Sequence, residues 1–211
     1  MEDRPARNAS DGIETPESIL GYWFGSSPDD AKVAAERHRL WWFKNAAVDD
    51  AIRERFECSL AAAASGELDD WASKPNSLLA LVLLTDQFPR NIYRESARAF
   101  AFDAKALAWC LGGMTSGLHL ALRPIERVFF YLPLEHAESV ECQEQSVGLF
   151  RELLASVSVD QKSAFESFLD FAVRHRNIIA RFGRFPHRNK ILGRPSTPEE
   201  LAFLADPGSS F

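Results

Sequence analysis

The sequence predicts a single-domain, all-α protein, and three observations support this. Apolar residues recur at helical spacing, helix start and stop signals follow one another at short intervals, and no segment alternates like a strand. A chain of 211 residues, 46% hydrophobic, can bury well over half of the surface that its unfolded form exposes. We therefore expect one helical domain over residues 14–206, between a disordered N-terminal tail (1–13) and a C-terminal tail (207–211).

Local signals place each helix in order. Thr15 and Pro16 form an N-cap followed by proline at the first helical position, and Gly25 ends that helix. Signals of the same kind predict helices at residues 16–24, 28–43, 50–65, 77–88, 103–111, 124–132, 139–155 and 160–182, and a short one from 198. Pro89 and Pro133 are expected to end the helices that precede them.

The order of these helices predicts their packing. Helices of this length with short connections favour antiparallel helix pairs stacked side by side. The element order favours a right-handed α-α superhelix, although no strict repeat of about 34 residues is present.

Composition excludes several classes of function. The net charge of −6 argues against a general nucleic-acid binder. The most apolar run, residues 78–84, is too short to cross a bilayer, so no membrane association is expected. The three cysteines lie far apart and read as reduced thiols, which together with the lack of a visible signal peptide predicts a cytoplasmic location. No motif for a metal or a nucleotide is present, so we expect neither metal nor cofactor.

Charge is unevenly distributed. Residues 171–198 contain no Asp or Glu and carry seven cations, six of them arginine. Within this tract, residues 184–191 (Arg-Phe-Pro-His-Arg-Asn-Lys-Ile) resemble residues 87–94 (Gln-Phe-Pro-Arg-Asn-Ile-Tyr-Arg). Both segments place arginine and asparagine just after a Phe-Pro step, and the arginine fork suits a carboxylate or phosphate. Two such corners facing each other would bind an anion, through Arg90, Asn91, Arg94, Arg181, Arg184, Arg188 and Asn189.

Two other interpretations of these arginines remain open. They could pair with nearby acids and lock helix ends together, which would make a structural ion-pair hub. They could also simply be solvated.

A third group of residues suggests proton transfer. Glu135 and His136 follow another helix-proline step, and His175 lies on the longest expected helix. Adjacent residues on a helix do not face each other, so contact between Glu135 and His136 is not expected. The candidates for acid–base chemistry are His136, His175 and His187, with Asp86 or Glu135.

Several motifs resemble the domain-of-unknown-function 924 family, an uncharacterised, mainly bacterial group. The similar stretches are residues 22–25 (Tyr-Trp-Phe-Gly), 41–44 (Trp-Trp-Phe-Lys), 66–68 with Trp71, 86–94, 99–101, 126–128, 131–136 (Tyr-Leu-Pro-Leu-Glu-His), 175–176 and 179–189. The resemblance covers about residues 15–205 and implies a helical fold similar to tetratricopeptide repeats, but no activity. Thr85 and Leu134 depart from the family pattern, where leucine and phenylalanine are expected.

Two functions therefore remain open besides the hub. The chain could be a binding module whose cleft captures an anionic peptide or small molecule. It could instead be a small enzyme that acts on an anionic metabolite by proton transfer between a histidine and an acid. The clustering of polar residues in three corners favours the enzyme, and the lack of a recognisable nucleophile favours the binding module. Whether the protein is an enzyme, and its oligomeric state, stay open.

Overall fold

A computed structural model describes residues 12–209, and within them every regular element is a helix. Residues 1–11 of the expected disordered N-terminal tail and residues 210–211 of the expected C-terminal tail lie outside the described residues. The α-helices are α1 (Pro16–Phe24), α2 (Asp30–Trp42), α3 (Ala46–Ser65), α4 (Pro75–Val82), α5 (Phe88–Ile92), α6 (Asp103–Thr115), α7 (Pro124–His136), α8 (Val140–Ser156), α9 (Lys162–Phe182) and α10 (Pro198–Leu204). Shorter 3₁₀ turns are η1 (Asp69–Ser73), η3 (Ala97–Phe100), η4 (Leu118–Ala121) and η5 (Pro186–Arg188), and η2 (Leu83–Gln87) is a π-helical turn. None of the helices in this range is long and apolar enough to cross a bilayer.

Most helix ends lie where the local signals predict them. The Thr15 side chain accepts a hydrogen bond from Ser18 N–H, and Thr197 and Glu200 form a capping box on α10. Gly66 and Gly183 end α3 and α9 with φ of 93° and 68°, the left-handed conformation that glycine adopts most easily.

The expectation that Pro89 and Pro133 end helices is wrong. Pro133 lies inside α7, and Pro89 lies in the first turn of α5, which continues from α4 through the π-helical turn. There the Phe88 N–H donates to the Leu83 carbonyl, five residues back. The wider turn provides room before the proline ring, so the chain keeps its direction.

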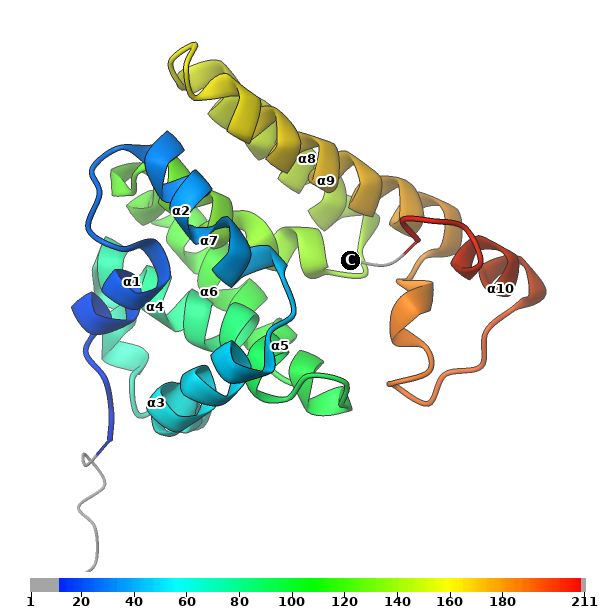
Figure 1. Cartoon of the computed structure of the whole chain (residues 1–211), viewed down its shortest axis with the longest axis horizontal. Helices are drawn as coiled ribbons and strands as arrows, with labels where there is room; N and C mark the ends of the chain where they lie inside the picture. Colours follow the sequence, from blue (N-terminus) through cyan, green and yellow to red (C-terminus); the bar gives the residue numbers. More distant parts are fainter. Residues whose placement is uncertain (1–11, 210–211) are drawn as a thin grey trace, which may run out of the picture.

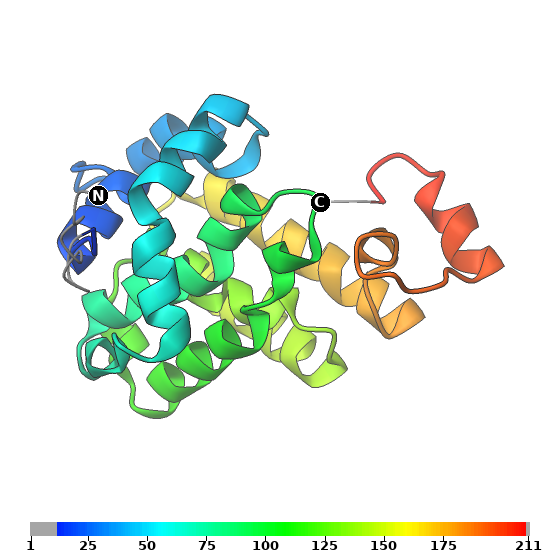
Figure 2. The same cartoon turned by 90° about the horizontal axis from the view of Figure 1, so that it is seen from below.

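The core surrounds α4. Residues 78–84 are all at most 2% exposed, and α4 contacts α1, α6 and α7. The α8–α9 hairpin lies along one side of this body and packs on α7 (Figure 1). Beyond the end of α9, η5 and α10 form an extension with its own small core around Ile178, Ile179 and Phe185 (Figures 1 and 2).

Candidate functional site

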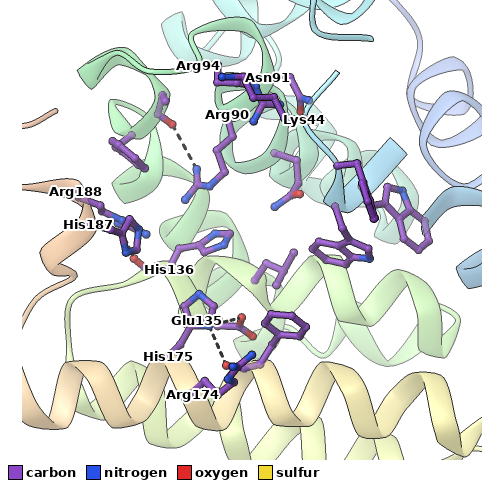
Figure 3. A pocket seen from close by; sticks show the side chains of 18 of the residues that line it. Lys44, Arg90, Asn91, Arg94, Glu135, His136, Arg174, His175, His187 and Arg188 are labelled. Carbon is purple, nitrogen blue, oxygen red and sulfur yellow. Dashed lines mark hydrogen bonds and ion pairs between the residues drawn. The ribbon is translucent and has the colours of Figure 1, made fainter. Parts of the chain in front are cut away.

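A cavity of about 730 Å³ lies between α5, the C-terminal end of α7, α9 and η5. It has two different walls. One wall carries charged and imidazole side chains, shown in Figure 3. The other wall is aromatic and consists of Trp41, Trp42, Phe43, Phe150, Phe168 and Phe171.

His136, at the last residue of α7, is held by Asp86 from the π-helical turn. Its Nδ1 lies 2.8 Å from Asp86 Oδ1, and Asp86 is fully buried. Burial alone would raise the pKa of Asp86, but the charge of Arg90 and the side-chain hydrogen bonds from His136 and Gln87 lower it. Asp86 is therefore ionised and accepts the Nδ1 proton, so Nε2 is the basic nitrogen of neutral His136. Burial and then Arg90 lower the pKa of His136, which keeps the ring neutral.

Arg90 has a complete set of carboxylate partners. Its guanidinium donates to both oxygens of Asp103, at 2.9 and 3.2 Å, and lies 3.6 Å from Asp86. It also donates to the Asp86 carbonyl at 2.7 Å. Burial opposes the charge of Arg90, but Asp86 and Asp103 outweigh it and raise its pKa. Arg90 thus fixes the position of Asp86 behind His136.

Arg188 is buried with few partners. It is 6% exposed, and its guanidinium lies between the rings of Phe100 and Phe185, with centroids at 4.8 and 4.4 Å. Its Nη1 donates to the His136 carbonyl at 3.1 Å and reaches Asp103, already held by Arg90, at 3.4 Å. Its Nε is buried and has no hydrogen-bond partner among the described residues. Burial and then the charge of Arg90 lower the pKa of Arg188 to about 10.

Glu135 and His175 form a second carboxyl–imidazole pair. The Nδ1 of His175 lies 3.0 Å from Glu135 Oε1 and 2.9 Å from the Phe171 carbonyl. A carbonyl can only accept, so Nδ1 carries the proton. Burial, and then the nearby Asp86, raise the pKa of Glu135 to about 8. Burial lowers the pKa of His175 to about 3, so at neutral pH Glu135 keeps its carboxyl proton and His175 is a neutral imidazole with its one proton on Nδ1.

Three more of the predicted site residues line the cavity: His187, Arg94 and Asn91. Burial, and then the charge of Arg188, lower the pKa of His187 to about 4. Arg94 and Asn91 also line the cavity, but both bind Asp49, which Arg94 contacts with two nitrogens at 2.6 and 2.8 Å. These two side chains therefore already have an acidic partner.

The other predicted anion ligands do not line the cavity. Arg181 pairs with Glu199 on the surface, and Arg184 binds both oxygens of Glu200 at 2.6 and 2.9 Å. Asn189 is buried and donates to the same Glu200 at 3.3 Å. These residues anchor α10 to the tract that carries Arg188. Within the C-terminal tract, Arg188 therefore lines the cavity, whereas Arg181 and Arg184 form ion pairs with acids of α10.

Sequence reasoning missed several residues of the site. Asp103, which both Arg90 and Arg188 contact, carries only the sequence signal of a helix start. Aromatic residues at helical spacing such as Trp41 and Trp42 are typical of a core, but both line the cavity and Trp42 is 43% exposed. Arg174 lines it too, beside the C-terminal turn at Gly208. Within residues 12–209 no group of His, Cys, Asp and Glu could hold a metal ion.

The walls of the cavity suit different parts of one ligand. The polar wall offers an under-coordinated guanidinium and a basic imidazole nitrogen, and the other wall offers ring faces. Bringing these groups together could bind an anion and transfer a proton.

Comparisons with known proteins agree on one family. The model of a family described as a bacterial protein of unknown function, DUF924, matches residues 19–208. A solved structure of a protein of unknown function from Agrobacterium tumefaciens is 38% identical and superposes with a TM-score of 0.76, covering 90% of this chain and 96% of that one. No curated protein matches the chain.

Proposed function

The chain belongs to the DUF924 family of bacterial proteins, and we propose that it binds a small amphipathic anion in the cavity between α5, α7, α9 and η5. The ligand has a carboxylate or phosphate head and an apolar or aromatic body. Arg188 is the observation that carries this proposal. Burying an arginine without a full set of partners is costly, and such a group is expected where a ligand completes its coordination.

The electrostatics favour an anion at this arginine. Arg90 and Arg188 share Asp103, and Arg90 makes the shorter contacts with that carboxylate. An incoming carboxylate or phosphate would give Arg188 the charge-assisted hydrogen bonds that it lacks. The rings of Phe100 and Phe185 fix the plane of the guanidinium, so little side-chain entropy is lost on binding.

The aromatic wall favours a small molecule with an apolar body. Trp42, Phe43 and Phe171 are exposed at 43%, 55% and 42%, although side chains of this kind are usually buried. A ligand body that covers them gains about 25 cal/mol for each Å² of apolar surface removed from water. A strongly polar metabolite would leave this wall unused.

Calorimetric titration with matched probes tests the proposal. We expect 4-phenylbutyrate to bind and to raise the melting temperature, and the neutral 4-phenylbutyramide to bind at least tenfold more weakly. Arg188→Gln should weaken the carboxylate by about 1.5–3 kcal/mol, the range for a hydrogen bond to a charged group. Arg181→Gln removes an exposed arginine outside the cavity and is the matched control.

Equal affinity of the acid and the amide, or no binding of either, would show that the cavity does not select anions. Equal losses in the two arginine variants would assign the effect to general surface charge. Inorganic phosphate and acetate, tested in parallel, report whether the head group alone is sufficient.

Two finer expectations belong to this proposal. The right-handed superhelix of antiparallel pairs similar to tetratricopeptide repeats is supported by the contacts that join α6 to α7, α7 to α8 and α8 to α9. The cytoplasmic location is supported by the three free cysteines.

A further inference from the structure

We propose that the cavity is the active site of an enzyme, with Nε2 of His136 as the general base that removes a proton from the bound anion or from a water beside it. This inference rests on the proposed binding function, because the anion must first be held at Arg188. It goes further in assigning a chemical step and the atom that performs it.

The first support is the orientation of His136. Asp86 is fully buried, accepts the Nδ1 proton at 2.8 Å and is itself held by Arg90 and by Gln87, whose Nε2 donates to Oδ2 at 2.6 Å. Such a carboxylate fixes one tautomer and stabilises the imidazolium that forms when the ring accepts a proton. A histidine with a purely structural role needs only one hydrogen bond, not a buried charged chain of this length.

The second support is the position of the ring. His136 lines the cavity, and Figure 3 shows it between Arg90 on one side and His175 on the other. Its backbone carbonyl accepts from Arg188 at 3.1 Å, so the base and the anion-binding arginine are joined directly. A head group bound at Arg188 is therefore held next to the ring of His136.

The third support is an acid close to the base. The rings of His136 and His175 are 6.3 Å apart, and His175 contacts Glu135, a carboxyl that its buried environment keeps protonated near neutral pH. Two carboxyl–imidazole pairs in one cavity, one holding a proton and one ready to accept a proton, are the arrangement that acid–base catalysis requires.

The proposed step balances without a further reactant. The N–H bond forms at Nε2 while the O–H or C–H bond of the ligand or water breaks, and its electron pair stays on the oxygen or carbon. The imidazolium charge is offset by Asp86. His136 then donates the same proton to the atom that carries negative charge in the product, which restores the neutral imidazole; where Glu135 donates its own proton instead, the proton on His136 passes to the Glu135 carboxylate.

Alkylation by bromoacetate tests the inference without knowledge of the substrate. The reagent is a small carboxylate, and the reaction forms an N–C bond at Nε2 while the C–Br bond breaks and bromide leaves. We expect peptide mass mapping to locate the label at His136. Labelling should be about tenfold faster with bromoacetate than with neutral bromoacetamide, because a cationic site concentrates anions. Saturating 4-phenylbutyrate should protect the residue.

Two variants distinguish the role of the base, His136, from that of Asp86, the carboxylate that orients it. His136→Gln should abolish this label but leave any label on the cysteines. Asp86→Asn should slow labelling of His136 across the pH range, because the tautomer is no longer fixed. Should the Asp86 variant fail to fold, the ratio of the two reagents in the unmodified protein decides alone.

The outcomes distinguish this inference from the proposed function. If 4-phenylbutyrate binds but His136 reacts no faster with bromoacetate than with bromoacetamide, the general base is wrong and the anion site stands. If 4-phenylbutyrate neither binds nor protects, the anion site itself is wrong. A label that maps to His175 or His187 instead would also overturn the assignment to His136.

Discussion

At the scale of single residues, burial decides the chemistry of the site. Glu135 and His175 are 3% and 5% exposed, and each prefers its neutral form because the protein interior solvates charge poorly. Asp86 is buried as deeply but stays charged, since Arg90 and His136 surround it. Immediate neighbours thus leave Asp86, behind the cavity wall, charged, and leave Glu135 and His175, which line the cavity, neutral.

Glu135→Gln should change how stability depends on pH. The folded pKa of Glu135 is raised to about 8, from 4.5, so between these values the folded state holds a proton that the unfolded state releases. The free energy of unfolding of the wild type therefore falls as pH rises, and the glutamine variant lacks this pH dependence. The variant should gain about 1 kcal/mol per pH unit relative to the wild type between pH 5 and 8, measured by urea unfolding.

Glu138→Gln is the control for this measurement. Burial opposes ionisation of Glu138, but hydrogen bonds from Arg194 and the Phe185 N–H lower its pKa. Its stabilising contribution is complete above the unfolded pKa and is lost only as pH falls through the folded value. The control should therefore differ from the wild type by a constant amount over pH 5–8. A constant difference for Glu135→Gln would contradict the raised pKa.

At the scale of elements, close packing of α6 holds the segment that carries Asp86. Gly113 on α6 faces α4 and α7, and a Cβ there would lie 2.5 Å from Leu78 and 2.6 Å from Phe130. Its neighbour Gly112 is exposed, and a Cβ there would meet nothing within 4 Å. Two adjacent glycines in one helix therefore serve different purposes.

The two alanine substitutions should shift stability in opposite directions. Gly113→Ala forces α6 away from α4 and should cost about 1–3 kcal/mol, the usual range for overpacking. Gly112→Ala removes backbone freedom from the unfolded chain and should gain about 0.5–1 kcal/mol. Guanidinium unfolding of both variants measures the difference. Changes of the same sign would mean that α6 does not pack tightly at Gly113.

At the scale of the whole molecule, the cavity adjoins a second hollow. This hollow, of about 570 Å³, lies between α2 and α9 and is lined largely by small residues, Ala31, Ala34, Ala35, Ser163, Ala164 and Ser167. Both hollows share the side chains of Trp42, Phe43, Phe168 and Phe171. A long apolar ligand body could therefore extend from the charged wall past these rings to α2.

Carboxylates of increasing length should test this path. Affinity should rise from butyrate to decanoate, by at most about 0.8 kcal/mol for each added methylene that is buried. Ala35→Trp fills the second hollow and should weaken decanoate but not butyrate, whereas Ala61→Trp, at an exposed position of α3, should change neither. Calorimetry measures each affinity. A flat dependence on length, or equal effects of both variants, would confine the ligand to the first cavity.

The helices themselves could be predicted from the sequence wherever their signals are local. Each helix cap bonds a residue at most four positions away, so it can be predicted without tertiary structure. This holds for the caps at Thr15, Gly66, Gly183 and Thr197. The family resemblance, carried by whole motifs, is confirmed over residues 19–208. Pro89 and Pro133 failed as stop signals because the chain stays helical through both, after a π-helical turn at Pro89 and inside the buried helix α7 at Pro133.

The sequence by itself determined an all-helical chain and the residue types of the site, including Arg90, His136 and Arg188. Only the tertiary structure decided which arginines line the cavity and which acid each arginine contacts. Arg94 finds Asp49 across 45 positions, and Arg188 reaches Asp103 across 85. A helix cap depends on residues within about one turn of the helix end. The partner of a charged side chain instead depends on which distant parts of the chain the apolar core brings together. Because of this difference in range, the positions of the helices could be predicted from the sequence, but the partners of the arginines could not.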